Sequence, residues 1–235
     1  AAARLTTPEQ RRIQFAASDT PALYGDGCAA DWETIEPVTE GCVYGDRDAE
    51  TTIALFGDSH AAHWFPAMEE AARKEGWRIV VYVKNACPSV DVKAYRNPRL
   101  GRTYTECVTW RERVVRHLAE TKPDLVVLSN LVRDVHLLGE GDQRPIWAQG
   151  LARMALELEE ASIPSLVITD IPAPETNVPN CLSRAAGPSL VPAPDCSFDR
   201  DAAPNQGFAA LDRAAMKATP SGRAIDFDEV ICPEQ

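Results

Sequence analysis

From residue 51 onward, short apolar runs alternate with amphipathic segments, and this alternation restricts the chain to few folds. Such alternation is typical of parallel strands that are covered by helices. Runs that are apolar almost throughout indicate strands buried on both faces. The sequence therefore predicts an α/β domain with a central, mostly parallel, five-stranded sheet, whose strands are Thr52 to Phe56, Arg78 to Val83, Asp124 to Ser129, Ser165 to Thr169 and Arg223 to Phe227.

The segments between these runs have the 3.6-residue period of helices that bury one face. A helix is expected from Ala61 to Lys74 and another from Phe208 to Ala218. Two further helices are indicated by apolar stripes, which we interpret as core and not as ligand-binding positions: Cys107, Trp110, Val114 and Leu118 in one, and Leu151, Met154, Ala155 and Leu158 in the other.

Two segments interrupt this pattern. Residues 1–50 are polar and are expected to form an N-terminal arm or stem with one cysteine pair, so that residues 51–235 form the α/β domain. Residues 171–206 are rich in proline and make a connection too long for an ordinary loop. This connection is either a disulfide-pinned flap over a site or a stiff surface loop. Because ligands bind beyond the carboxyl ends of parallel strands, the flap is slightly favoured.

The formal net charge of −11 argues against partners that are nucleic acids or anionic membranes, and it fits a neutral or sugar-like substrate better. No window has the run of about 20 apolar residues that crosses a bilayer, and the N-terminus has no apolar region of a signal peptide. The segment Thr6 to Arg12 reads as a surface helix that continues from something upstream. The chain is therefore expected to be a piece of a longer protein.

Seven cysteines suggest disulfides and an extracytoplasmic compartment, although seven reduced cysteines in a cytosolic enzyme remain the alternative. Sequence does not fix the connectivity. Pairing between neighbours is the simplest arrangement and leaves Cys232 as the odd thiol. No spacing resembles a zinc site, and neither a metal nor a cofactor is expected. The neighbouring pairs are Cys28 with Cys42, Cys87 with Cys107, and Cys181 with Cys196.

The corner Gly57-Asp58-Ser59-His60 lies where the first predicted strand gives way to the first predicted helix. A serine here is exposed beside helix-terminal N–H groups, which suits a nucleophile because these donors and the helix dipole stabilise developing negative charge. The alternative is that Ser59 merely caps the helix, since serine is favoured at this position.

Two further features belong to the same edge of the predicted sheet. The turn Asn85-Ala86-Cys87-Pro88 follows the second strand, and Asn130 follows the third. In a parallel sheet these points meet at the carboxyl edge, where a backbone turn and an amide next to Ser59 would have the layout of an oxyanion hole.

The order of strand, Gly-Asp-Ser, helix and a later Asn resembles the SGNH hydrolase superfamily, which is named for its Ser, Gly, Asn and His. The resemblance is closest to the SGNH domain that is fused to acyltransferase-3 membrane proteins, and it covers roughly residues 50–233. It depends on Gly57 to Ala61 with Trp64 and Pro66 to Met68, on Ala86-Cys87-Pro88, on Cys107 and on the closing segment Ile225 to Pro233.

The resemblance implies a three-layer α/β/α sandwich of the flavodoxin-like type. It also implies that Ser59 is the nucleophile, and that the N–H of Ser59, a backbone N–H near Ala86 and Asn130 form the oxyanion hole. The usual Gly-x-Asn-Asp is absent around Asn130, and no glycine follows the second strand. Asp58 is expected to hold the turn, and His60 to support the site.

The base is the largest departure from the family, which carries Asp-x-x-His near its C-terminus. No such motif follows Cys232, so the sequence suggests that the domain is truncated and that its base lies beyond Gln235. Within the chain, His136 with Asp134 is a weak candidate, and His60 a weaker one because adjacent side chains at a sharp turn point apart. His63 and His117 are expected to be surface or structural residues.

The sequence thus predicts a serine-dependent O-acyl transfer, with acetyl the expected group, to a cell-surface glycan through an acyl-serine intermediate. The partners would be a glycan acceptor, an acyl donor and a membrane acyltransferase-3 domain in the same polypeptide. A carbohydrate O-acetylesterase is one alternative, because transfer and hydrolysis differ by acceptor positioning and water exclusion. A non-catalytic module that binds a glycan or a partner and lacks its base is the other.

Overall fold

The computed structural model describes residues 8–132, 139–174, 176–185, 194–203, 205 and 207–233. The chain forms two compact units. The smaller consists of residues 1–20 and 172–206, and the larger of residues 21–171 and 207–235. The division at residue 50 that the sequence suggested remains a prediction. The flap formed by residues 171–206 also remains a prediction.

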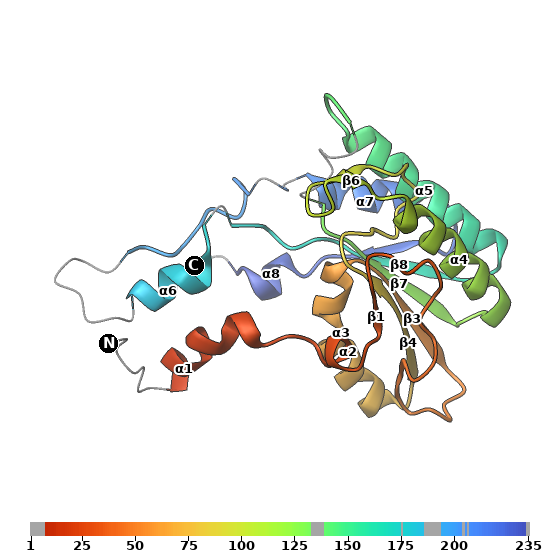
Figure 1. The fold of residues 1–235 in the computed structure, drawn as a ribbon, viewed down its shortest axis with the longest axis horizontal. Helices are drawn as coiled ribbons and strands as arrows, with labels where there is room; N and C mark the ends of the chain where they lie inside the picture. Colours follow the sequence, from red (N-terminus) through yellow and green to blue (C-terminus); the bar gives the residue numbers. More distant parts are fainter. Residues whose placement is uncertain are drawn as a thin grey trace. The chain divides into compact units, whose positions relative to one another are not determined.

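The larger unit is an α/β fold with a mostly parallel central sheet between helices (Figure 1). Its five predicted strands are confirmed with small changes in their bounds. They pair in the order β4 (Arg78–Lys84), β3 (Thr52–Gly57), β7 (Leu125–Ser129), β8 (Ser165–Ile168) and β9 (Arg223–Ile225), all parallel. Numbered along the chain, this is the order 2-1-3-4-5 of flavodoxin-like sheets.

The prediction of a five-stranded sheet was wrong in number, because the described residues form a seven-stranded one. The two additional strands are β1 (Ala29–Ala30), parallel to β4, and β2 (Val43–Gly45), antiparallel to β4. Both come from the polar segment before residue 51. Strands of two and three residues are too short to leave a periodic pattern in the sequence. A separate hairpin of β5 (Arg96–Asn97) and β6 (Arg102–Thr103) lies outside this sheet.

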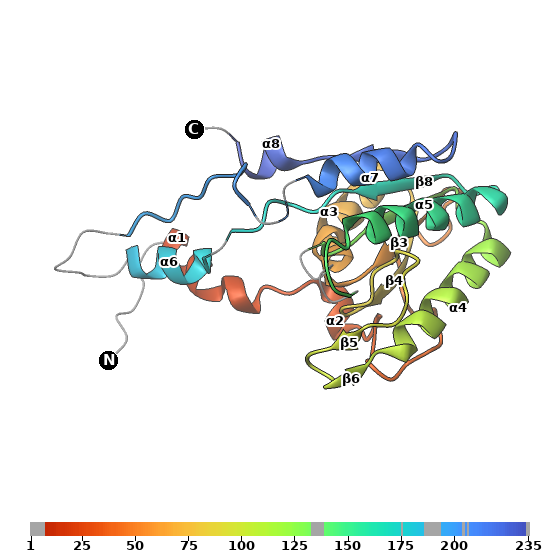
Figure 2. The same ribbon diagram turned by 90° about the horizontal axis from the view of Figure 1, so that it is seen from above.

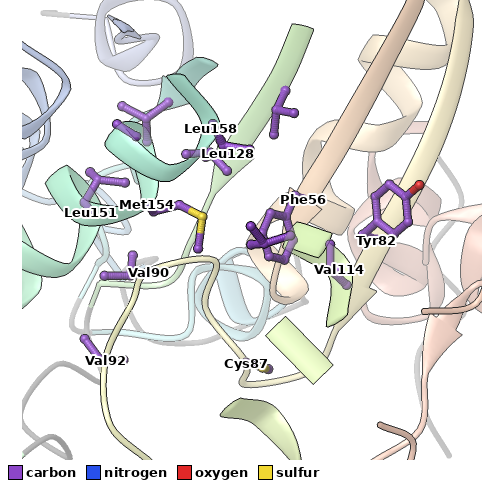
Figure 3. Close-up of a cluster of buried hydrophobic side chains, with 14 of the residues drawn as sticks. Phe56, Tyr82, Cys87, Val90, Val92, Val114, Leu128, Leu151, Met154 and Leu158 are labelled. Carbon is purple, nitrogen blue, oxygen red and sulfur yellow. The ribbon is translucent and has the colours of Figure 1, made fainter. Parts of the chain in front are cut away.

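Side-chain alternation explains why the strands read as continuous apolar runs. Along β3, Ala54 and Phe56 belong to one buried cluster, whereas Ile53 and Leu55 belong to the other. Helices α4 (Thr105–Thr121), α5 (Arg144–Glu160) and α7 (Phe208–Met216) supply the first cluster, part of which Figure 3 shows. Helices α3 (Ser59–Glu75) and α2 (Ala22–Gly25) supply the second. The three layers are seen from the side in Figure 1, and the view from above in Figure 2 looks through α4 and α5 onto the sheet.

The predicted helical stripes lie in the core as expected. Trp110, Val114 and Leu118 of α4, together with Leu151 and Met154 of α5, are almost completely buried. Helix α3 ends at Gly76, whose φ of 68° is in the left-handed region that glycine adopts without strain. Beyond β9, a single turn, α8 (Asp228–Ile231), begins after Phe227, whose ring packs against Trp64 at 5.0 Å between centroids.

The smaller unit contains helix α1 (Pro8–Phe15), the 3₁₀ turn Ala16–Ser18 and helix α6 (Val178–Ala185), and α1 packs against α6 (Figure 1). One disulfide, Cys181 to Cys196, closes its second segment. The structure confirms all three predicted disulfides, since Cys28 pairs with Cys42 and Cys87 with Cys107 in the larger unit. Cys232 is in none of these three. No helix in the described part of the chain is long and apolar enough to cross a membrane.

Candidate active site

Ser59 lies at the first position of α3, directly beyond the carboxyl end of β3. The residue that caps this helix is Asp58, whose Oδ1 accepts a hydrogen bond from the backbone N–H of His60 at 2.8 Å. The alternative that Ser59 is the cap is therefore wrong. Ser59 is partly exposed, and among the described residues its hydroxyl has no hydrogen-bond partner. Asp58 thus caps the helix, and the hydroxyl of the neighbouring Ser59 does not take part in capping.

Gly57 makes this sharp corner possible. A side chain at this position would overlap with the carbonyl oxygen of Ser129 on β7 and would crowd Ala61 on α3. Glycine is therefore required because strand and helix approach each other closely here.

Asp58 also fastens the neighbouring strand. Its Oδ2 accepts a hydrogen bond at 2.9 Å from the backbone N–H of Leu131, which follows β7. The side chain is 2% exposed, and this burial raises its pKa to about 6, although the nearby His60 and two backbone donors favour the charged form. The sequence-based expectation that Asp58 holds the turn matches these contacts.

Asn130 is buried at the end of β7, and Ser89 fixes its orientation. The amide oxygen of Asn130 accepts hydrogen bonds from the backbone N–H of Ser89 at 2.7 Å and from the Ser89 hydroxyl at 3.0 Å. Because a backbone N–H can only donate, the accepting atom must be Oδ1. The amino group Nδ2 is left as the donor end of the amide. The geometry thus makes Asn130 an oriented hydrogen-bond donor at the carboxyl edge.

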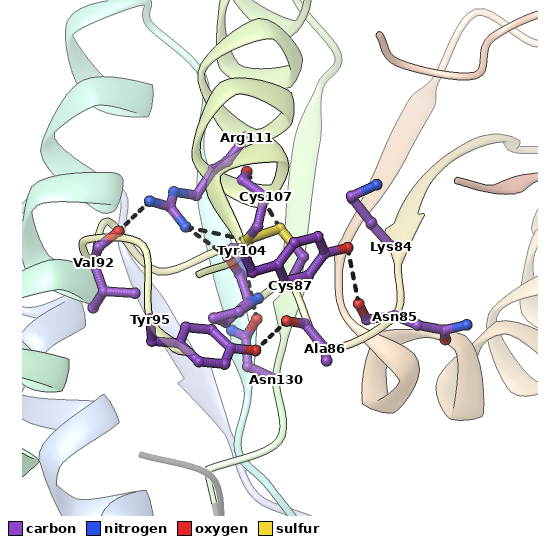
Figure 4. The surroundings of a disulfide bond; sticks show 12 residues. Lys84, Asn85, Ala86, Cys87, Val92, Tyr95, Tyr104, Cys107, Arg111 and Asn130 are labelled. Carbon is purple, nitrogen blue, oxygen red and sulfur yellow. Dashed lines mark hydrogen bonds between the residues drawn. A yellow bond between two sulfur atoms is a disulfide. The ribbon is translucent and has the colours of Figure 1, made fainter. Parts of the chain in front are cut away.

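The turn after β4 is held from several sides (Figure 4). Ala86 has a φ of 51°, in the left-handed region, and its carbonyl oxygen accepts a hydrogen bond from the Tyr95 hydroxyl. The disulfide between Cys87 and Cys107 joins the turn to the first helical turn of α4. The turn after β4 is therefore held firmly enough to keep the backbone N–H near Ala86 in place.

Arg111, which is buried on α4, holds the segment that follows this turn. Its guanidinium donates to the carbonyl oxygens of Val92 at 2.5 Å and Pro88 at 3.4 Å (Figure 4). Ser89 lies between these two residues. Arg111 therefore supports Asn130 indirectly, through the segment that carries Ser89.

A second carboxylate, Asp170, lies at the same edge and was missed by the sequence reasoning. Its Oδ1 is 2.5 Å from Nδ1 of His60, and the same oxygen accepts a hydrogen bond from the N–H of Ile171 at 3.1 Å. Its Oδ2 accepts from the N–H of Val132 at 3.0 Å. With a side chain that is 3% exposed, Asp170 joins the segments that follow β3, β7 and β8.

A carboxylate in this position fixes the imidazole of His60. A proton on Nδ1 points at Asp170, so the neutral ring carries its basic lone pair on Nε2. Among the described residues, however, no imidazole nitrogen forms a hydrogen bond with the Ser59 hydroxyl. The pair therefore has the orientation of an acid–base dyad without a direct contact to Ser59.

The signal that would have found Asp170 was present in the sequence. It is the first acidic residue after the fourth predicted strand, and the rule that selected Asn130 after the third strand selects it equally. Its partner could not be predicted, because His60 is 110 positions away in the chain.

The other histidines take different places. The exposed His63 stacks its ring on that of His60, with 4.9 Å between centroids. His117 lies on α4, edge-on to Tyr82. The weak candidates Asp134 and His136 lie outside the described residues. Within the described part of the chain, no group of three His, Cys, Asp or Glu side chains is placed to hold a metal ion.

Comparisons with known proteins identify the family of this site. A family profile for the SGNH domain fused to AT3 domains matches residues 27–235. The chain belongs to this family. Among curated proteins, none matches it significantly.

A solved structure shares the fold of this SGNH domain. The periplasmic domain of a lipopolysaccharide acetyltransferase from Salmonella ser. Paratyphi A is similar with a TM-score of 0.63 at 17% identity, over 98% of this chain and 83% of that one. A putative acylhydrolase from Bacteroides fragilis has a TM-score of 0.45 at 16% identity, over 81% of this chain and 74% of that one. At such identities the likeness concerns the fold alone.

Proposed function

We propose that this SGNH domain transfers a short acyl group, with acetyl the simplest, to a hydroxyl of a cell-surface glycan through an ester on Ser59. The observation that carries the proposal is the placement of the Ser59 hydroxyl. It lies at the N-terminus of α3, it is relieved of capping by Asp58, and it has no hydrogen-bond partner among the described residues. A hydroxyl that neither caps the helix nor forms a hydrogen bond within the protein is in a position suited to a nucleophile.

The reaction has two steps. Ser59 Oγ attacks the carbonyl carbon of the acyl donor, the bond from that carbon to the donor's leaving atom breaks, and the leaving group takes up the proton of the Ser59 hydroxyl. The glycan hydroxyl then attacks the acyl-serine carbon, Ser59 Oγ departs, and the proton of the glycan hydroxyl returns to it. Both steps pass through a tetrahedral intermediate with a negative oxygen.

The oxyanion would be stabilised by donors from three strand ends. These are the N–H of Ser59 at the positive end of α3, the oriented Nδ2 of Asn130 and the N–H of Ala86. Preorganised donors of this kind stabilise a transition state more than freely rotating ones, because they need not reorient as charge develops.

His60 and Asp170 would act as a positioning pair. The pair fastens the first turn of α3 to the ends of β7 and β8, and so fixes the N–H groups next to Ser59. A positioning role agrees with the lack of a hydrogen bond between His60 and Ser59 Oγ.

Family membership and compartment support the same proposal. The family is named for its fusion to AT3 domains, and a lipopolysaccharide acetyltransferase contains a periplasmic domain of the same fold. Three disulfides agree with an extracytoplasmic location. An AT3 domain in the same polypeptide would then deliver the acyl group across the membrane.

The test is covalent labelling of the full-length protein with 4-nitrophenyl acetate, followed by mass spectrometry of the peptide that contains residues 57–63. We expect one acetyl group on Ser59 in the wild type and none in Ser59→Ala. Ser162→Ala, which changes an exposed serine after α5, is the matched control and should label normally.

Two outcomes separate the alternatives. Acetyl label that water removes, with no transfer to an added glycan, would indicate an O-acetylesterase. Equal labelling of Ser59→Ala and wild type would contradict the nucleophile and leave a non-catalytic binding module. That module is favoured by one observation, namely that no described imidazole forms a hydrogen bond with Ser59 Oγ.

A further inference from the structure

A cavity of about 420 Å³ lies in the larger unit, away from Ser59. Its walls include Thr52 and Arg78, which are the first residues of β3 and β4, and Pro123, which precedes β7. It therefore begins at the amino edge of the sheet and extends along β4 as far as Tyr82, whereas Ser59 is at the carboxyl edge. A volume of a few hundred Å³ is ordinary for small-molecule sites, which span about 300–1,000 Å³.

The charge of this cavity is opposite to that of the chain. The chain has 35 acidic and 24 Lys and Arg residues, yet the residues lining the cavity include Arg47 and Arg78 and no carboxylate. In the described part of the chain, neither arginine forms an ion pair. The nearby Asp124 is not among the lining residues, and its Oδ2 accepts a hydrogen bond from the N–H of Thr52 at 2.8 Å. The cavity is thus a local cationic site.

Arg78 is held in a fixed orientation by a neutral partner. Its Nε and Nη2 donate to the hydroxyl oxygen of Thr52 at 2.9 and 2.6 Å, and the residue is partly buried. These contacts use one edge of the planar guanidinium. The other edge is formed by Nη1 and Nη2. In arginine, this edge is able to bind a carboxylate or phosphate through two parallel hydrogen bonds. Among the described residues, Nη1 has no partner.

The rest of the lining suits a ligand that carries hydroxyl groups and C–H faces, such as a sugar ring. Thr39 contributes a hydroxyl group, whereas the hydroxyls of Thr52 and Thr121 already contact Arg78 and the carbonyl oxygen of His117. The apolar lining from β2 and β4 consists of Val43, Val80, Val81 and the ring of Tyr82. Hydroxyls recognise sugar hydroxyls, and valines pack against C–H faces.

We propose that this cavity binds an anionic sugar of about monosaccharide size, whose carboxylate or phosphate is held by Arg78 with help from Arg47. The proposal does not depend on acyl transfer, because the site is on the opposite edge of the sheet from Ser59.

The test is an NMR titration of the ¹⁵N-labelled full chain. We use D-glucuronate and glucose 6-phosphate as the two anionic sugars and glucose as the neutral one. Both anionic sugars should shift the amides of residues 38–47, 78–82 and 117–121, and the tighter of the two identifies the preferred anion. Glucose at the same concentration should shift none of them. The affinity should fall with added salt, as expected for an ionic contact.

Variants assign the effect to the arginines. Arg78→Gln should raise the Kd about 10-fold or more, since a hydrogen bond to a charged group contributes about 1.5–3 kcal/mol. Arg47→Gln removes an exposed charge and should raise it about 2- to 5-fold. The control is Arg73→Gln on α3, an exposed arginine paired with Glu69 and absent from the lining, and it should bind as wild type.

Two results would overturn the proposal. One is the absence of shifts around Arg78 with both anionic sugars, and the other is an unchanged Kd in both Arg78→Gln and Arg47→Gln. Arg47→Gln keeps the test decisive if Arg78→Gln fails to fold, because Arg47 is exposed and forms no ion pair in the described part of the chain. Ser59→Ala should bind these sugars normally, so failure of this proposal and failure of the acyl-serine proposal are distinguishable.

Discussion

The carboxyl ends and the amino ends of β3 and β4 differ in the charged side chains that lie there and in the hydrogen bonds that these side chains form. At the carboxyl edge, Asp58 and Asp170 are buried, and together they accept hydrogen bonds from backbone N–H groups in the segments that follow β3, β7 and β8. At the amino edge, Arg78 is fixed by a hydroxyl and keeps a donor edge open. Buried acids that are saturated with donors organise a backbone, whereas a cation with spare donors is suited to a ligand. The carboxyl edge of the sheet is thus fixed by its own hydrogen bonds, whereas the amino edge keeps hydrogen-bond donors of Arg78 for a ligand.

The largest effect is expected from Asn130→Ala, which removes the side-chain donor of the proposed oxyanion hole. The acylation rate should fall about 10²- to 10³-fold, the usual loss for one such donor. The measurement is the release of nitrophenol from 4-nitrophenyl acetate by the full-length protein.

Two matched variants sharpen this result. Ser89→Ala keeps the N–H bond to Asn130 and loses only the hydroxyl, so a decrease of about 10-fold or less is expected for one neutral hydrogen bond. Arg78→Gln, at the other edge, should acylate as wild type. An Asn130→Ala rate within about threefold of wild type would remove Asn130 from the oxyanion hole.

The next effect concerns stability, and it follows from the raised pKa of Asp58. Burial raises the pKa of Asp58 to about 6 in the folded state, whereas the pKa of a free aspartate side chain is 3.8. Between these values the folded state binds more protons, so stability falls as pH rises. The difference of about two pKa units amounts to about 3 kcal/mol.

Urea unfolding of the larger unit, followed through its tryptophans between about pH 4 and pH 7, measures this effect. Wild type should lose up to about 3 kcal/mol relative to Asp58→Asn, which has no charge to bury. Parallel curves for wild type and Asp58→Asn would contradict a raised pKa for Asp58.

The smallest of the three effects is expected from Asp170→Asn. This variant keeps the shape of the side chain and removes the charge that orients His60, so the acylation rate should fall about 10- to 100-fold through misplacement of the first turn of α3. The ¹⁵N shifts of the His60 ring should show loss of the Nδ1-protonated tautomer. A normal rate with an unchanged tautomer would show that Asp170 only holds the backbone.

Hydrophobic periodicity, together with the Gly and Pro residues that end helices, predicted most of the fold. The five long strands and the helical stripes of α4 and α5 were evident because both faces of the sheet and one face of each helix are buried. Strands β1 and β2 escaped prediction because pairing with β4, and not their own pattern, makes them strands. Neighbouring cysteines were correctly paired, with separations of 14, 20 and 15 residues.

The candidate site was only partly evident before the structure. Ser59, Ala86 and Asn130 were selected because each follows a predicted strand, and the parallel sheet brings such positions to one edge. The roles of Asp170 and Ser89 depend on contacts with His60 and Asn130 across 110 and 41 positions of the chain, which no local pattern records.

By itself, the sequence determined the family, the parallel α/β fold and the corner that carries Ser59, because these follow from local periodicity and from residues adjacent in the chain. Only the tertiary structure decided that Asp58 and not Ser59 caps α3, that Asp170 orients His60, and that Arg78 presents an open donor edge. The physical reason is common to all three. Hydrogen-bond partners are chosen by distance and direction in space, and these are set only when the strands have paired.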